Sequence, residues 1–145
     1  MDGSERSVEL VRADKGVYDA VNARGGRLRL STGDDDHFSP VELLLVAIAG
    51  CTAADVDFIT AKRAEPDRFV DRARADKMRD EGGNCLRDIR VTFDVRFPDG
   101  EGGEAARGVL PEAVRRSHDR LCTVSRTVEL GTPIEVVVEP DDRSG

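Results

Sequence analysis

Three cysteines carry most of the redox chemistry available to this chain of 145 residues. Cys51 lies in a long apolar stretch and Cys122 ends a predicted helix, whereas Cys85 lies at the mouth of a polar turn and is expected to be exposed and inactive. In a reducing compartment, two thiols that meet are more often redox-active than structural. If the segments of Cys51 and Cys122 pack together, a peroxide can oxidise one thiolate to a sulfenic acid, and the second thiol can then condense with it to form a disulfide.

Such chemistry needs a lowered thiol pKa, and burial alone raises the pKa of a thiol, so a nearby cation is required. Arg24, Arg27 and Arg126 are the candidates for this cation. A cysteine next to Gly50 in a helix can also be a small packing residue without chemistry, and this role for Cys51 stays open beside the reactive one.

Other kinds of site are not indicated. The chain has only two histidines, His37 and His118, and no C-x-x-C, so a zinc site is not expected. The acidic segment Thr32–Phe38 lacks the ligand spacing of an EF-hand and is interpreted as a solvated loop. Neither histidine has a nucleophile partner typical of a hydrolase. We therefore predict neither a metal nor a cofactor.

Composition restricts the partners. The net charge is −7, and charged residues make up 35% of the chain against 39% hydrophobic ones. An acidic chain lacks the basic surface that nucleic acids require. The polar N-terminus resembles no signal peptide, and we find no apolar run of about 18 residues that would span a membrane. These features predict a cytoplasmic protein without nucleic-acid or membrane partners, and the small apolar share favours a core that is shared in a dimer.

The stretch Ser39–Ile59 organises the predicted fold. Ser39 and Glu42 form an S-x-x-E capping box, and Pro40 suits the first helical position. Residues 43–49 are apolar on every face, so we expect this helix, over Pro40–Ala64, to be buried on all sides.

The remaining elements form sheets and a second helix. Alternating segments predict an antiparallel meander of three strands, then a hairpin whose second strand is the clearest in the chain, a helix and a closing strand. Arg68–Met78, the first half of the hairpin, could also be helical. This order predicts one α+β domain over residues 1–145, with flexible tails at 1–6 and 140–145. The segments are Ser7–Val11, Val17–Ala23, Arg27–Ser31, Arg68–Met78, Leu86–Phe97, Glu104–Leu121 and Ile134–Val138.

Two motifs resemble those of the OsmC/Ohr family. Residues 39–52, SPVELLLVAIAGCT, are similar to the family's segment around its first cysteine, and residues 118–126, HDRLCTVSR, to its second cysteine motif. The resemblance implies an intertwined homodimer with antiparallel sheets wrapped around two long central helices. It also implies reduction of organic hydroperoxides, with Cys51 as the peroxidatic and Cys122 as the resolving cysteine, and a dithiol as the reductant.

One position departs from the family pattern. Characterised peroxidases of the family carry a glutamate directly after the proline, where this chain has Val41, and the acid follows one place later at Glu42. One residue turns a helical side chain by about 100°. We therefore expect an oxidative-stress peroxidase that uses Cys51 and Cys122, with Glu42 as a third candidate catalytic residue. The alternative is an OsmC-like dimer without turnover, which binds a small molecule or senses redox state.

Overall fold

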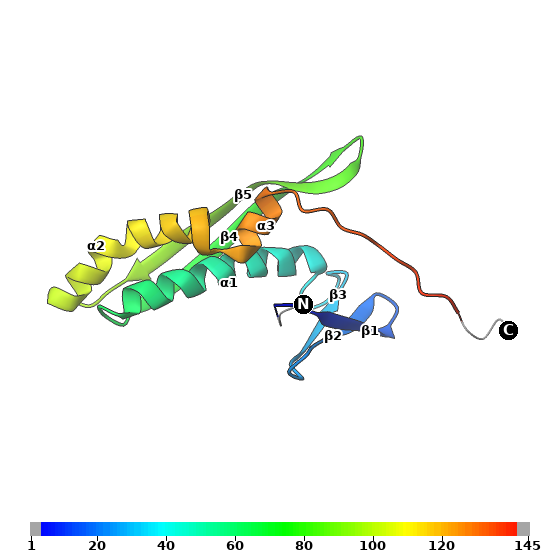
Figure 1. The fold of residues 1–145 in the computed structure, drawn as a ribbon, viewed down its shortest axis with the longest axis horizontal. Coiled ribbons are helices and arrows are strands. Elements are labelled where there is room, and N and C mark those ends of the chain that lie inside the picture. The colour runs from blue at the N-terminus through cyan, green and yellow to red at the C-terminus, as the bar shows by residue number, and fades with distance from the viewer. Residues whose placement is uncertain (1–3, 142–145) are drawn as a thin grey trace. The chain divides into compact units, whose positions relative to one another are not determined.

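The computed structural model describes residues 4–141, and over these it forms two antiparallel sheets and three α-helices (Figure 1). The predicted α+β class is confirmed. The chain divides into two compact units, one of residues up to Gly50 with Val70–Asp94, the other of Cys51–Phe69 with the residues from Val95 onward. The predicted tails, 1–6 and 140–145, lie partly outside the described residues.

The first unit opens with the predicted meander. Strands β1 (Val8–Asp14), β2 (Val17–Asn22) and β3 (Arg27–Ser31) pair in that order, and both pairs are antiparallel. Gly16 makes the first turn with a φ of 72°, which glycine adopts at no steric cost. The alternation of apolar and polar residues was thus sufficient to predict this sheet.

The capping box begins helix α1 (Pro40–Ala61) as predicted. The backbone N–H of Glu42 donates to Ser39 Oγ at 3.2 Å, and the N–H of Ser39 donates to Glu42 Oε1 at 2.9 Å. These two bonds satisfy donors that the first turn of a helix would otherwise leave free.

The prediction that α1 is buried on all sides is wrong for the single chain. Only every fourth residue is buried along its second half, a stripe formed by Ile48, Thr52, Val56 and Thr60. On other faces Val46 is 49% exposed and Phe58 is 76% exposed. Within residues 4–141, the helix is thus buried along one stripe, and apolar side chains outside this stripe are exposed.

The predicted absence of a membrane-length apolar stretch also needs correction. By length and composition alone, α1 is apolar enough to cross a membrane, a test that the core helix of a soluble protein also passes. The absence of a membrane partner stays a prediction.

A long hairpin follows α1. Strands β4 (Arg68–Asp80) and β5 (Gly83–Arg96) form the second sheet, so Arg68–Met78 is a strand rather than a helix. The N–H of Asp67 donates to the carbonyl of Arg96 at 2.8 Å and closes the base of the hairpin.

The second unit contains the other two helices. Helix α2 (Glu101–Arg116) ends in a π-helical turn at Ser117–Leu121, and α3 (Thr123–Glu129) follows directly after Cys122. The helix predicted over Glu104–Leu121 is therefore longer at its start and altered at its end, and α3 was not predicted.

Helix α2 lies antiparallel to the last turns of α1 (Figure 1). At one end Ser117 Oγ donates to Asp55 Oδ2 at 2.8 Å. At the other, a Cβ on Gly102 would lie 2.7 Å from the carbonyl oxygen of Arg63. The buried residues of α2 and of the turn after it are small, which lets the two backbones approach closely; they are Gly103, Ala106, Ala113 and Ser117.

The predicted closing strand, Ile134–Val138, is not a strand in the structure. The segment has no regular structure and is exposed, with Ile134 at 87% and Val138 at 89%. A strand exists only when a neighbour takes up its backbone hydrogen bonds. Within residues 4–141, no strand pairs with this segment.

Two glycines of α2 give a test of the close packing in the second unit. A Cβ at Gly103 would overlap the carbonyl oxygen of Pro98, whereas one at Gly108 meets nothing within 4 Å. We expect Gly103→Ala to lower the free energy of unfolding by about 2 to 4 kcal/mol, because the backbone must move. Gly108→Ala should raise it by up to about 1 kcal/mol, because alanine favours a helix interior. Urea unfolding measures both, and equal effects would contradict this packing.

Candidate functional site

The structure brings Cys51 and Cys122 together within the second unit. Cys51 lies half-buried on α1, and Cys122 is fully buried immediately before α3. The two thiols are free and hydrogen-bonded to each other. The third cysteine, Cys85, is exposed on β5, as expected. The site is therefore a pair of reduced sulfurs from segments that lie 71 residues apart in the sequence.

Cys122 is surrounded by polar groups that are themselves buried. Its sulfur accepts a hydrogen bond from the backbone N–H of Ser125 at 3.3 Å, and its thiol donates one to the Ser125 hydroxyl oxygen at 3.2 Å. The hydroxyl of Thr52, one residue after Cys51 on α1, lies 3.6 Å from the same sulfur. Thr52 and Ser125 are each less than 10% exposed. Buried polar groups pair with one another at such positions because water does not reach them.

The turn before Cys122 explains this placement. The N–H of Cys122 donates to the carbonyl of Ser117 at 2.8 Å, across the wider ring of the π-helical turn. The backbone then becomes extended at Cys122, so its side chain can fold back and cap α3 through Ser125. Ser117 is in turn bonded to Asp55 of α1. The turn thus fixes the sulfur against the face of α1 that carries Cys51.

The two thiols differ in acidity. Burial raises the pKa of Cys51, and its hydrogen bond and charge interaction with Cys122 raise it further, against backbone N–H groups of Val124 and Thr123 that act to lower it. Burial also acts to raise the pKa of Cys122, but the bonds from Ser125, Cys51 and Thr52 together outweigh it, so that pKa lies below its ordinary value. The more acidic thiol is therefore the more deeply buried one.

Glu42 has a structural role in the described chain. Its carboxylate accepts the N–H of Ser39 in the capping box of α1, in the first unit. The Cys51 and Cys122 thiols belong to the second unit. The role predicted for Glu42 in catalysis stays a prediction.

Of the candidate arginines, Arg126 is not among the groups that shift the two thiol pKa values, and Arg24 and Arg27 belong to the first unit. Within residues 4–141, the groups that shift the two thiol pKa values are backbone N–H groups, hydroxyls and the thiols themselves. Near Arg24 and Arg27, Arg29 pairs with Asp19 across the meander at 2.7 Å. Within residues 4–141, no three His, Cys, Asp or Glu side chains converge as a metal ion would require.

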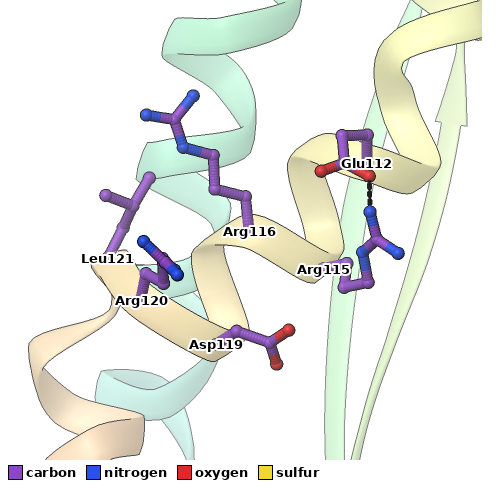
Figure 2. Close-up of a pocket in the computed structure, with 6 residues that line it drawn as sticks. All are labelled: Glu112, Arg115, Arg116, Asp119, Arg120 and Leu121. Atoms are coloured by element: carbon purple, nitrogen blue, oxygen red, sulfur yellow. Dashed lines mark hydrogen bonds and ion pairs between the residues drawn. The ribbon is translucent and has the colours of Figure 1, made fainter.

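An open groove of about 650 Å³ lies near the end of α2 (Figure 2). Figure 2 shows that its lining is mostly charged and that Arg115 pairs with Glu112. The lining residues are Glu112, Arg115, Arg116, Asp119, Arg120 and Leu121. Neither Cys51 nor Cys122 is among them.

A family model described as "OsmC-like protein" matches residues 33–137, a range that includes Cys51 and Cys122. The chain belongs to the OsmC-like family. No curated protein sequence matches it.

Solved structures show the same fold. A hypothetical protein from Aquifex aeolicus is 22% identical, with a TM-score of 0.70 over 89% of this chain and 90% of that one. An OsmC-like protein from Mycoplasma pneumoniae is 16% identical, with a TM-score of 0.69 over 89% of each chain. The organic hydroperoxide resistance protein OhrB of Bacillus subtilis is 18% identical, with a TM-score of 0.54 over 86% of this chain and 90% of that one. The resemblance to this family is thereby confirmed.

Ser125 and Thr52 are site residues that our sequence analysis missed. A signal for Ser125 was present, because it stands three residues after Cys122, and a residue that caps a helix bonds the N–H two or three residues later. That signal was hidden because α3 itself was not predicted. For Thr52 no local signal exists, because its contact depends on how α1 and α3 pack.

Substitution of Glu42 by glutamine distinguishes its role in capping the helix from an effect of its negative charge on the thiols. Glutamine also completes a capping box, so Glu42→Gln should leave the unfolding midpoint unchanged, whereas Ser39→Ala should cost about 1 kcal/mol. If capping is the whole role of Glu42, the rate of thiol oxidation by an organic hydroperoxide should stay within about twofold in Glu42→Gln, since the glutamine amide oxygen still accepts the N–H of Ser39. Thermal unfolding and thiol titration measure the two effects. A tenfold slower oxidation with unchanged stability would show that its charge serves the site.

Proposed function

We propose that this OsmC-like chain is a thiol peroxidase that reduces organic hydroperoxides, with Cys51 as the peroxidatic and Cys122 as the resolving cysteine. The observation that carries the proposal is the hydrogen-bonded pair of free thiols on α1 and before α3. The fold shared with a protein named for organic hydroperoxide resistance supports the substrate class. The role belongs to oxidative-stress defence in the cytoplasm.

The reaction takes place in two steps. The sulfur of Cys51 attacks the terminal oxygen of the hydroperoxide, so that an S–O bond forms, the O–O bond breaks, and the alkoxide leaves as an alcohol after it takes up a proton. The sulfur of Cys122 then attacks the sulfenic sulfur, an S–S bond forms, and hydroxide leaves. A dithiol reductant restores both thiols by exchange.

The exposure of the two thiols supports this division of roles. Cys122 is completely buried, whereas Cys51 is partly exposed, so a peroxide reaches Cys51 first. Cys122 is already bonded to Cys51 and can attack as soon as the sulfenic acid forms.

The working unit in this proposal is a homodimer. Apolar side chains on the uncovered faces of α1, among them Val46 and Phe58, need cover, and so does the apolar segment Ile134–Val138. Exposed apolar surface of this extent is typical of a protein interface. A second copy of the chain supplies that cover and offers a sheet to which the extended segment can add.

A redox sensor without rapid turnover is the second candidate. The raised pKa of Cys51 favours it, because the thiolate is the nucleophile and a higher pKa leaves less of it at neutral pH. In this case the pair forms a disulfide slowly and signals through it.

A thiol titration tests the proposal. One equivalent of cumene hydroperoxide should remove two of the three free thiols of the wild type within seconds to minutes and produce one equivalent of alcohol. Cys85→Ser is the matched control, and it should lose both of its remaining thiols at the same rate, since Cys85 lies outside the pair.

The other two cysteine variants identify the roles. Cys51→Ser should lose no thiol, and Cys122→Ser should hold a sulfenic acid at Cys51 that dimedone traps. A wild type that keeps all its thiols would remove both candidates. Disulfide formation without sustained peroxide consumption in the presence of dithiothreitol would favour the sensor.

The dimer is tested at the C-terminal segment. We expect the wild type to sediment as a dimer at micromolar concentration, and Val136→Asp to weaken the dimer at least tenfold, because burial of an unpaired charge is costly. Glu135→Gln, at the neighbouring position, is the control and should change the dissociation constant less than threefold. Sedimentation velocity distinguishes these outcomes, and a monomeric wild type would contradict the dimer.

A further inference from the structure

We infer that Asp55 is a positioning residue for the resolving step. Through its bond with Ser117 it holds the turn before Cys122 in place against α1, so that it governs disulfide formation and not the first attack on the peroxide. The catalytic part of this inference rests on the proposed peroxidase function. The positioning of one thiol against the other does not, and a reagent other than a peroxide measures it.

The turn before Cys122 is buried at its two ends. Of residues 117–122, Ser117 and Cys122 are buried, whereas the four residues between them are exposed. Among these four, Asp119 and Arg120 line the open groove (Figure 2). The hydrogen bonds between the turn and α1 involve the two buried residues.

The π-helical ring brings these two residues onto the same neighbour. In a regular α-helix, five residues turn by about 500°, so side chains at positions 117 and 122 would point about 140° apart. The N–H of Cys122 instead donates to the carbonyl of Ser117 at 2.8 Å, which closes the wider ring of a π turn. Both residues thus bond to α1, Ser117 to Asp55 and Cys122 to Thr52.

Helix α1 presents the matching pair of residues. Cys51 and Asp55 are four positions apart, so they are neighbours on one side of the helix, with a rise of about 6 Å between them. Ser117 Oγ donates to Asp55 Oδ2 at 2.8 Å, and the Ser117 side chain is fully buried. A hydrogen bond to a carboxylate is stronger than one between neutral groups. The bond at Asp55 therefore fixes the turn about one helical turn away from the thiol that Cys122 must reach.

The resolving step depends on this placement more than the first step does. Cys51 meets the peroxide from solvent, and its own helix positions it. Cys122 must bring its sulfur within bonding reach of the Cys51 sulfur, in line with the S–O bond that breaks. A displacement of about 1 Å can slow such a reaction by about a hundredfold. Loss of the Asp55 bond should therefore slow disulfide formation and leave the first attack unchanged.

Dithiodipyridine measures both steps without a peroxide. The Cys51 thiolate attacks one sulfur of the reagent, so that a mixed disulfide forms, the S–S bond of the reagent breaks, and one thiopyridone leaves after it takes up a proton. The Cys122 thiolate then attacks the Cys51 sulfur, the protein disulfide forms, and a second thiopyridone leaves in the same way. All variants carry Cys85→Ser, so each coloured release reports one step.

Asp55→Ala tests the positioning residue. The second release should slow by about ten- to a hundredfold, while the first release stays within about twofold of the wild type. Asp55→Asn keeps an oxygen that accepts from Ser117, and it should hold the second release within about threefold of the wild type. Asp57→Ala, the matched control, removes an exposed carboxylate two residues further along the same helix and should leave both releases unchanged.

Ser117→Ala removes the other partner of the bond. Because both substitutions break the same bond, the double variant Asp55→Ala/Ser117→Ala should be no slower in the second release than the slower single variant. Effects that multiply would overturn the inference. An Asp55→Asn variant as slow as Asp55→Ala would also overturn it. So would a first release slowed as much as the second, which is the result of a general loss of structure.

Cumene hydroperoxide connects this test to the proposed function. Asp55→Ala should consume the first equivalent of peroxide at the wild-type rate, but its sulfenic acid at Cys51 should persist until dimedone traps it, whereas the wild type forms the disulfide first. A fast second release in Asp55→Ala would refute the inference and leave the peroxidase proposal intact. A wild type that releases thiopyridone in two steps but does not react with peroxide would refute the proposed function alone.

Discussion

The contact of Cys122 with Thr52 and Ser125 is the constraint on which the second unit depends. It joins the start of α3 to α1 through a buried sulfur, and the bond from Ser117 to Asp55 holds the preceding turn to the same helix. Because these groups are buried and polar, loss of any partner would leave another unsatisfied, which costs more than the bond itself contributes. The same contact places the sulfur beside Cys51, so one set of interactions stabilises the packing of the helices and creates the chemistry of the site.

The core of a single chain is small and partly polar. Its largest fully buried side chains are Val56, Thr60, Cys122 and Ser117, whereas several apolar side chains of α1 are exposed, among them Leu44 at 40%, Val46 at 49% and Phe58 at 76%. The helix is apolar on every face, but only one stripe of it is buried. Its other faces therefore leave apolar side chains in contact with water. The homodimer proposed above would cover this surface, and it would also cover the exposed apolar segment Ile134–Val138.

Local patterns predicted the elements whose partners are close in sequence. The meander, the capping box and the strand β5 each follow from turn residues, spacing or alternation within a few residues. The π-helical turn and α3 did not follow, because the predicted helix ended at Leu121 and the contacts that hold Cys122 and Ser125 come from residues distant in sequence or from α3 itself. The segment Ile134–Val138 has the pattern of a strand, but a strand also needs a neighbour, and sequence pattern alone does not say on which chain that neighbour lies.

The site shows the same division between what is local and what is not. The two cysteine motifs identified both thiols, but the acidity of each depends on contacts between segments that are about 70 residues apart. The expected support was a carboxylate and an arginine, and Val41 stands where that carboxylate would be. Around Cys122 the structure instead has uncharged donors from Ser125 and Thr52. Uncharged donors that meet a buried sulfur can stabilise a thiolate without a cation, because each bond acts in a region from which water is excluded. Thiol chemistry in this chain can therefore do without a glutamate at position 41. The groups that can support it are the donors from Thr52 and from the first turn of α3.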